Sequence, residues 1–216
     1  MYHADLRALM QGSDEELLEA WRQGDRRSGA ALFERHYEPV ARFFRNKVGD
    51  RDGPDLIQKT FLALVESRER FQGHSSFRTF LFAVARNVLG KHYRTRRRDG
   101  ARLDFGVTAA HDLGPSPTQI LAKHGEQRLL LQALRRIPLD YQVILELYYW
   151  ESMKAAEVAT IVNIPLGTAR TRIRRAKQLL EQQLALLADS PARLESTISR
   201  LDDWAHRLRA QLVDKR

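Results

Sequence analysis

The stretch from 155 to 187 constrains the fold of this chain most strongly, because it reads as two amphipathic helices joined by a tight turn. Its first helix repeats small and aliphatic residues at the spacing of one buried face. These residues are Ala155, Val158, Ala159 and Val162. Asn163 tolerates the left-handed backbone of a turn, and Pro165 suits the entry of a second helix.

The second helix of this stretch has one apolar face and one cationic face. The apolar face carries Ala169, Ile173, Ala176 and Leu180. The opposite face carries Arg170, Thr171, Arg174, Arg175, Lys177 and Gln178. Between 163 and 180 there are five Arg or Lys residues and no acid, which favours a helix-turn-helix that enters the DNA major groove. The alternative is an ordinary amphipathic hairpin with a solvated basic face.

The overall charge also favours a polyanionic partner. The 216 residues carry a formal net charge of +9, and a second basic cluster runs from Arg86 to Arg98 without an acid. Two separate basic helices suggest two separate contacts with nucleic acid. The chain has no cysteine, so neither a disulfide framework nor a thiolate metal site is expected.

Nothing in the sequence indicates a membrane protein. The first residues are charged and lack the apolar core of a signal peptide. No apolar run approaches the ~20 residues that a membrane span needs. We therefore expect a soluble cytoplasmic chain without membrane insertion.

Helical periodicity extends over most of the chain, and no segment has a convincing strand pattern. The Ser-Asp-Glu-Glu pattern at 13–16 predicts a capping box that begins the first helix. Further helices are predicted over about 28–48, 55–69, 76–97, 117–137 and 141–150. The predicted fold is all-α, with two helical domains on an extended linker and a C-terminal amphipathic helix. The predicted boundaries are 1–98, 99–117 for the linker, 118–187, and 188–216 for the C-terminal extension.

Two long segments resemble one family. "DLIQKTFLALVE" followed by "FRTFLFAVARNVLGKHYRTRRR" resembles the core of bacterial sigma subunits. "ALRRIPLDYQVILELYYWESMKAAEVATIVNIPLGTARTRIRRAKQLL" resembles the second conserved domain of the same proteins. The closest resemblance is to the extracytoplasmic-function (ECF) group of the sigma-70 family. It covers roughly residues 14–98 and 118–182, and the segment from about 187 onward is not covered.

The resemblance implies that the helix after residue 54 docks on the large subunit of core RNA polymerase. The implied docking residues are Asp55, Gln58, Lys59, Phe61 and Leu62. Polar and apolar side chains on one face are typical of interfaces. Without the resemblance, the favoured explanation is that Phe61 is a core residue and Asp55 a charge at the helix N-terminus. Lys59 departs from the family, which usually has an acid there, so a charge is reversed at or near the docking face.

The resemblance also implies a promoter-melting helix, whose side chains hold the non-template strand of the minus-ten element. The implied residues are His74, Phe80, Phe82, Arg86, Asn87, Lys91, Arg94, Arg96 and Arg97. Aromatic rings supply stacking platforms, and the cations follow the backbone of a single strand. For Phe80 plain core packing is an open alternative, and for the arginines a solvated helix end.

For the helix-turn-helix, the resemblance implies recognition of the minus-thirty-five element. The implied residues are Thr168, Arg170, Thr171, Arg174, Arg175, Lys177 and Gln178. The family usually opens the first helix of this unit with Gly and Ser, whereas this chain has Ser152 and Lys154. We expect Ser152 to cap that helix. Ala169 replaces a larger residue, which predicts looser packing.

The implied function is that of a transcription initiation factor, with core RNA polymerase and promoter DNA as partners. An anti-sigma factor is a further candidate partner. Catalytic motifs are absent, the seven histidines lack metal-ligand spacing, and neither an enzyme, a cofactor nor a metal site is expected. The rival hypotheses are a dimeric helix-turn-helix repressor and, more remotely, a nucleic-acid enzyme.

Two segments lie outside the conserved domains. In the linker, Asp104 and Asp112 could sit where RNA later passes, although a plain tether explains them equally well. The C-terminal extension repeats apolar residues in alternating steps of four and three. These are Leu194, Ile198, Leu201, Ala205, Leu208 and Leu212. We expect this helix to pack within the chain, as a stabilising cap or as a self-inhibitory cover, rather than to form a dimer.

Overall fold

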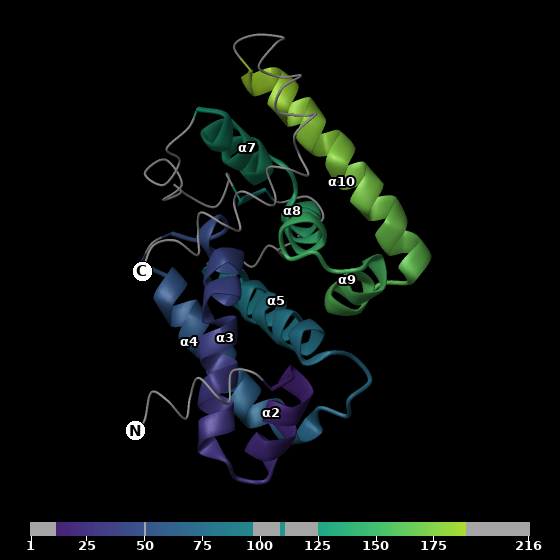
Figure 1. The fold of residues 1–216 in the computed structure, drawn as a ribbon. Helices are drawn as coiled ribbons and strands as arrows, with labels where there is room; N and C mark the ends of the chain where they lie inside the picture. Colours follow the sequence, from purple (N-terminus) through teal and green to yellow (C-terminus); the bar gives the residue numbers. More distant parts are fainter. Residues whose placement is uncertain (1–11, 50, 97–108, 111–124, 189–216) are drawn as a thin grey trace.

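The computed structural model describes residues 12–49, 51–96, 109–110 and 125–188. Within these residues the chain is helical and has no strand, apart from one antiparallel bridge between Ala109 and Pro138. The predicted all-α class is therefore confirmed (Figure 1). The helical elements are α2 (Asp14–Arg22), α3 (Arg26–Arg45), α4 (Gly53–Ser67), η1 (Arg68–Arg70), α5 (Phe77–Arg96), α7 (Gly125–Arg136), α8 (Leu139–Leu145), the π-helical η3 (Glu146–Trp150), α9 (Ala155–Val162) and α10 (Leu166–Leu187).

Side-chain caps determine where the first two helices begin. The Ser13 hydroxyl accepts a hydrogen bond from the Glu16 amide at 3.2 Å, and the Glu16 carboxylate accepts one from the Ser13 amide at 2.8 Å. This reciprocal pair is the predicted capping box, which is thereby confirmed. Asp25 then caps α3 by accepting from the Arg27 amide at 3.0 Å.

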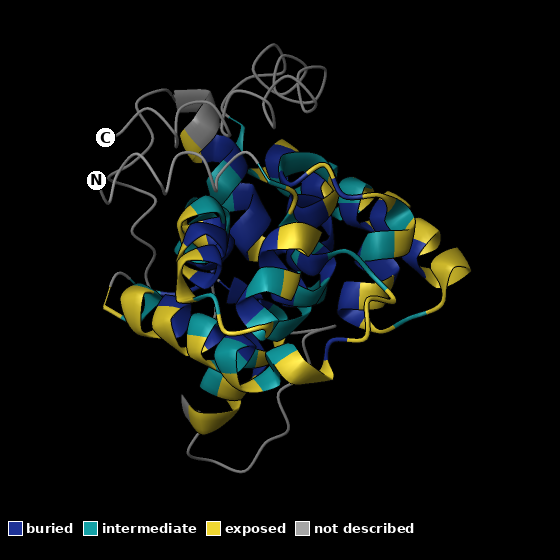
Figure 2. Cartoon of the chain, turned by 60° about the horizontal axis from the view of Figure 1, so that its bottom comes forward, coloured by how far each residue is buried: buried dark blue, intermediate teal, exposed yellow. Residues whose placement is uncertain are grey.

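Helices α2 to α5 form the N-terminal group, and they pack around aromatic and aliphatic side chains. Those that are completely buried include Leu32, Phe44, Leu64, Leu81 and Phe82. They recur at helical spacing on the inner sides of α3, α4 and α5, while exposed residues occupy the outer sides (Figure 2). Burial of these stripes is the main force that holds the four helices together.

A polar cluster fastens α2 to α3. The Asp14 carboxylate accepts a hydrogen bond from the Arg35 guanidinium and lies 2.7 Å from Nε2 of His36. Burial alone raises the pKa of Asp14, but the hydrogen bonds and charges of His36 and Arg35 outweigh burial and lower it below 3.8. Asp14 is therefore ionised in the folded chain at neutral pH.

Helices α7 to α10 form the C-terminal group, in which α10 packs on α7 through a second apolar cluster. The stripe predicted for α10 is buried throughout: Ala169, Ile173, Ala176 and Leu180. Of the buried face predicted for α9, Val158, Ala159 and Val162 are buried and Ala155 is half-buried. The prediction of a two-helix unit with opposed apolar and polar faces is therefore confirmed.

The turn between α9 and α10 has the backbone geometry that the sequence predicts. Asn163 has φ 54° and ψ 57°, which is the left-handed region. The amide of Ile164 donates to the carbonyl of Ala159 at 3.0 Å, which satisfies the end of α9. Pro165 follows with φ −59° and precedes the first residue of α10.

The two helical groups share a single core. Helix α9 packs against α5, and α8 and α9 lie between α10 and the N-terminal group (Figure 1). Leu147, Val158 and Ile161 belong to the same buried cluster as Phe44 and Phe82. Within the described residues, the groups therefore form one packed body.

Two local predictions need correction. The helix predicted over 141–150 begins at Leu139, and its last turn widens into the π-helical η3. Ser152 was expected to cap α9, but it has φ 51° and lies in a left-handed turn, too far from the helix to cap it. Lys154 is the N-cap instead, and its amide donates to the Glu157 carboxylate at 2.8 Å. Of the helix predicted over 117–137, the part from Gly125 to Arg136 is confirmed, and residues 117–124 lie outside the described residues.

Several predicted features lie outside the described residues. These include most of the linker, with Asp104 and Asp112, and the apolar repeat of the C-terminal extension. Two linker residues, Ala109 and Ala110, are described and buried. The Arg135 guanidinium donates to the Ala110 carbonyl at 2.9 Å, so this point of the linker is fixed to α7.

Gly29 of α3 lies directly under the Trp21 indole of α2. A Cβ atom at Gly29 would approach three atoms of the ring to 2.6–2.8 Å. Gly29→Ala should therefore lower the free energy of unfolding by about 1–3 kcal/mol, measured by urea denaturation and circular dichroism. Gly53→Ala is the matched control, because nothing lies within 4 Å of a Cβ there. Equal stability of the two variants would contradict the packing of α2 on α3.

Asn163 permits a direct test of the turn. Asn163→Ala should lower the unfolding free energy by about 1 kcal/mol, because a Cβ without a compensating side-chain hydrogen bond disfavours the left-handed region. Asn163→Gly should cost less or nothing, because glycine adopts this region freely. Thermal unfolding of both variants measures the difference. The opposite order of melting temperatures would argue against a left-handed residue at this position.

Candidate nucleic-acid interface

The outer face of α10 presents polar and cationic side chains to solvent. Six of the residues predicted to read the minus-thirty-five element are exposed: Thr168, Arg170, Thr171, Arg174, Arg175 and Gln178. Among the residues that the structure describes, none forms an ion pair with Arg170, Arg174 or Arg175. Lys177 is half-buried and lies at the edge of this face. A single helix fits the DNA major groove, and the arginines on this face are available to bond bases and phosphates there.

The outer face of α5 carries a second set of exposed polar groups. Asn87, Lys91 and Arg94 are exposed on successive turns of this helix. The side chain of Arg96 and all of Arg97 lie outside what the structure describes. His74, another of the predicted minus-ten residues, is exposed in the loop before α5 and contacts the Gln72 amide oxygen at 3.0 Å.

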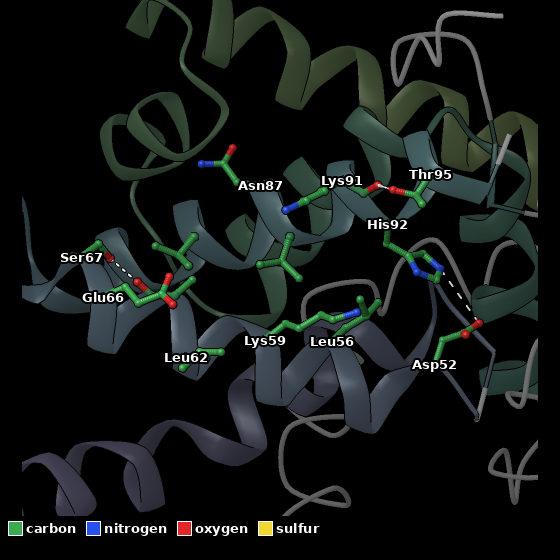
Figure 3. A pocket seen from close by; sticks show the side chains of 13 residues that line it. Asp52, Leu56, Lys59, Leu62, Glu66, Ser67, Asn87, Lys91, His92 and Thr95 are labelled. Atoms are coloured by element: carbon green, nitrogen blue, oxygen red, sulfur yellow. Dashed lines mark hydrogen bonds and ion pairs between the residues drawn. The ribbon is translucent and has the colours of Figure 1, made fainter. Parts of the chain in front are cut away.

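A groove of about 930 Å³ runs between α4 and α5. Its lining residues are Asp52, Leu56, Lys59, Leu62, Ala63, Glu66, Ser67, Val84, Asn87, Val88, Lys91, His92 and Thr95. Asn87 and Lys91 border it from α5, and Lys59, Leu62 and Glu66 from α4 (Figure 3). The structure thus brings predicted minus-ten residues next to predicted polymerase-docking residues.

The inner face of α5 is occupied by other parts of the chain. Phe82 is completely buried, with its ring centroid 5.8 Å from that of Phe43. Phe80 is half-buried and packs on Phe71 at 4.9 Å between centroids. In this arrangement both rings belong to the core and are not presented to a DNA strand, so their predicted contact with DNA stays a prediction.

The outer face of α4 carries the predicted polymerase-docking residues. Asp55, Gln58, Lys59 and Leu62 are exposed, whereas Phe61 is half-buried against Phe33 at 4.7 Å between centroids. Lys59 Nζ lies 2.7 Å from the carboxylate of Asp55 on the preceding turn. This ion pair offsets part of the charge that Lys59 reverses relative to the family pattern.

Four acids of the C-terminal group reach residues of the N-terminal group, and sequence analysis did not identify them. We call them the acidic row: Asp140, Glu146, Glu151 and Glu157. Asp140 accepts from Arg86 of α5 at 2.9 Å, and Glu151 accepts from Arg78 of α5 at 2.6 Å. Glu151 also accepts from Arg42 of α3 at 3.1 Å.

The most deeply buried member of the row is Glu146, which pairs with Lys47 just after α3. The Lys47 ammonium and the Gln142 amide, at 2.9 Å, both donate to the Glu146 carboxylate. Burial lowers the pKa of Lys47 and raises the pKa of Glu146, and their mutual attraction offsets part of each shift. Loss of either partner would leave the other charge buried without compensation.

One sequence signal could have identified Glu146 as a buried acid. Glu146 is the only charged residue between 141 and 150, a run that is otherwise apolar or aromatic except for Gln142. A buried acid requires a partner, but the sequence does not show that the partner is Lys47, about 100 residues away.

Neither metal-binding nor membrane-spanning features occur in the described part of the chain. Residues 12–49, 51–96, 109–110 and 125–188 contain no cluster of three potential metal-ligating side chains. None of the helices described here has the length and apolarity needed to cross a membrane.

Comparisons with known proteins identify relatives along most of the chain. The ECF RNA polymerase sigma-E factor of Haemophilus influenzae is 29% identical over 183 residues, which cover 80% of this chain and 95% of that protein. The RNA polymerase sigma-H factor of Pseudomonas aeruginosa is 26% identical over 186 residues, covering 82% of this chain and 96% of that protein.

Solved structures agree with the fold. The structure of CnrH in complex with the cytosolic domain of CnrY matches with a TM-score of 0.62 and 23% identity. That match covers 83% of this chain and 100% of CnrH. The sigma factor RpoE of Bartonella quintana, solved in complex with the anti-sigma factor NepR, matches with a TM-score of 0.53 and 20% identity. That match covers 68% of this chain and 91% of the matched chain.

Two family models match the chain in the order that the sequence predicts. Sigma-70 region 2 matches residues 32–99, which include α4 and α5. Sigma-70 region 4 matches residues 127–180, which include α9 and the cationic part of α10. The two matches together span more than half of the chain. The chain therefore belongs to the ECF group of the sigma-70 family, the transcription initiation factors of bacterial RNA polymerase.

Proposed function

We propose that this initiation factor contacts promoter DNA with the outer faces of α10 and α5, and core RNA polymerase with the outer face of α4. The main observation behind this proposal is that the cationic face of α10 is exposed to solvent, while the apolar residues on the opposite face of the same helix are all buried. The family matches support the role of each region. We retain 1–98 and 118–187 as the two functional domains, joined by 99–117 and followed by the extension 188–216.

Helix α10 would lie in the major groove at the minus-thirty-five element. Arg174 and Arg175 are exposed near the middle of the helix and can donate to guanine edges or phosphates. Gln178 can pair with adenine, and Thr171 with a phosphate or a base. The absence of an acid from 163 to 180 leaves no repulsion against the DNA backbone.

The outer face of α5 would hold the separated minus-ten strand. Lys91 and Arg94 lie on the same side of the helix as Asn87 and supply charge for phosphates. Asn87 can donate to and accept from a base that leaves the stack, and the groove between α4 and α5 has room beside it. We assign base recognition to Asn87 and the 72–76 loop, and a core role to Phe80 and Phe82.

The outer face of α4 would dock on the polymerase. Leu62 is 55% exposed and offers an apolar contact on this face. Asp55, Gln58 and Lys59 surround it with polar groups, as the rim of an interface does. Phe61 supports the face from below, through its contact with Phe33.

Other partners and roles follow from the family. Sigma factors are transcription factors rather than enzymes, so we assign the chemistry to the polymerase and no catalytic residue to this chain. The chain would act where the polymerase acts, in the cytoplasm. An anti-sigma factor remains a candidate partner, because RpoE was captured with one. The rival hypothesis of a dimeric repressor accounts less well for the chain, because a repressor needs neither a surface that docks on polymerase nor a helix that separates DNA strands.

The first test concerns α10. Arg174→Ala or Arg175→Ala should weaken binding of the holoenzyme to a minus-thirty-five duplex by about 1–3 kcal/mol if the contact is bidentate to a base. Fluorescence anisotropy measures the affinity. Arg136→Ala on α7 is the matched control, since it removes an exposed arginine elsewhere in the same group. Unchanged affinity in both α10 variants would exclude this face as the surface that binds the minus-thirty-five element.

The second test concerns α5. Asn87→Ala should change the base preference for strand opening while the affinity for core polymerase stays constant, because Asn87 lies on α5 and not on the docking face of α4. Permanganate footprinting on promoters varied across the minus-ten element measures the preference. Gln23→Ala, an exposed change at the end of α2, is the control. If Asn87→Ala kept the wild-type preference, base recognition would have to lie elsewhere.

A further inference from the structure

The C-terminal end of α2 is fastened to the segment that follows α4. Nε of Arg22 donates to the carbonyl oxygen of Arg68 at 3.2 Å. Nη2 of the same guanidinium donates to the carbonyls of Glu69 at 3.2 Å and Phe71 at 2.5 Å. The Arg68 guanidinium lies over the indole of Trp21, 5.1 Å from the ring centroid. Two neighbouring residues of α2 therefore hold η1 and the residue after it.

The chemistry of a helix end explains why an arginine occupies this position. The last carbonyls of a helix lack partners within the helix, and the helix dipole makes this end favourable for a cation. Phe71 is the C-cap of η1, and its amide donates to the Arg68 carbonyl at 3.3 Å. The planar guanidinium of Arg22 bonds that carbonyl and two more, because its donors are fixed in a fork. The backbone direction is thus set where the chain leaves the helix.

The chain continues from this point directly into the 72–76 loop. Phe71 is buried, whereas residues 72–74 are exposed. The far end of the loop is held by Ser76, whose hydroxyl accepts from the Thr79 amide at 3.2 Å and so caps α5. The loop is therefore anchored at both ends and open to solvent between them.

The anchored end of the loop also contacts the helix that carries Asn87. The Phe71 ring packs on Phe80 of α5, with 4.9 Å between the ring centroids. Phe80, Val84 and Asn87 follow one another at steps of four and three, so they share one face of α5. The position of the Phe71 backbone therefore sets how the loop lies relative to Asn87.

We propose that Arg22 is a positioning residue for recognition of the minus-ten element. By holding the Phe71 carbonyl, it fixes where the 72–76 loop begins and so places the loop relative to Asn87. Arg22 needs no contact with DNA for this role. The inference rests on the proposed function, which assigns base recognition to Asn87 and this loop.

Arg22→Gln removes the guanidinium, and Arg35→Gln is the matched control. The two arginine side chains are 26% and 24% exposed, and each joins α2 to another segment. Arg35 donates to the Gly12 carbonyl at 2.8 Å and to Asp14, at the beginning of α2. Both substitutions should lower the melting temperature, but the contacts of Arg22 alone lead into the loop.

The first readout is amide hydrogen exchange of the full chain, measured by mass spectrometry. Arg22→Gln should raise the exchange rate of amides 71–76 about tenfold, the size expected for the loss of a hydrogen bond to a charged group. Arg35→Gln should leave these amides unchanged. If Arg22→Gln does not fold, Arg22→Lys replaces it, because lysine keeps the charge but not the planar fork.

The second readout is the base preference of strand opening by the holoenzyme, measured by permanganate footprinting. Arg22→Gln should reduce the ratio of opening between preferred and disfavoured minus-ten bases about fivefold, the lower end of what one base contact provides. The affinity for core polymerase should stay constant. Arg35→Gln should keep the wild-type ratio, and Gln72→Ala combined with His74→Ala should change it.

The outcomes separate this inference from the proposed function. Unchanged exchange of the loop in Arg22→Gln, or an equal loss of base preference in Arg35→Gln, would overturn the positioning role. Faster exchange with the wild-type preference would also overturn it, provided that the Gln72, His74 double variant alters the preference. If the double variant did not, the assignment of the loop would be at fault. Hydrogen exchange alone would then decide whether Arg22 fixes the loop.

Discussion

The buried ion pair between Lys47 and Glu146 is the interaction on which the arrangement of this sigma factor depends. Lys47 lies two residues after the end of the long helix α3, and the Tyr93 hydroxyl of α5 donates to its carbonyl. Glu146 lies in the π-helical turn after α8 and also accepts from Gln142. The pair therefore ties α3 and α5 to α8 at the centre of the molecule. Two charges at this depth are tolerated only while they remain together, so the pair favours one orientation of the two groups.

This orientation divides the functional surface into accessible and occupied parts. The outer face of α10 and the groove between α4 and α5 remain open to solvent. The inner face of α5 is covered by α9 and the acidic row, so Arg78 and Arg86 contact carboxylates.

The sequence predicts the parts of this structure that depend on local patterns. Helical periodicity identified the buried stripe of α10, and turn chemistry identified the left-handed Asn163. Long-range contacts were not predicted, because a single sequence does not reveal that Glu146 pairs with Lys47 or that Asp140 meets Arg86. The same limit explains the core position of Phe82, since an aromatic residue on a basic helix fits both packing and stacking on DNA. The cap predicted at Ser152 was wrong because a left-handed turn intervenes before α9.

The central claim is that the two helical groups share one core in the free factor. Differential scanning calorimetry of the full chain tests it most directly, with tryptophan fluorescence as a second probe, because Trp21 lies in the N-terminal group and Trp150 in the C-terminal group. The account predicts a single transition, with equal calorimetric and van't Hoff enthalpies and coincident fluorescence and helicity changes. Two separate transitions, one for each group, would contradict it.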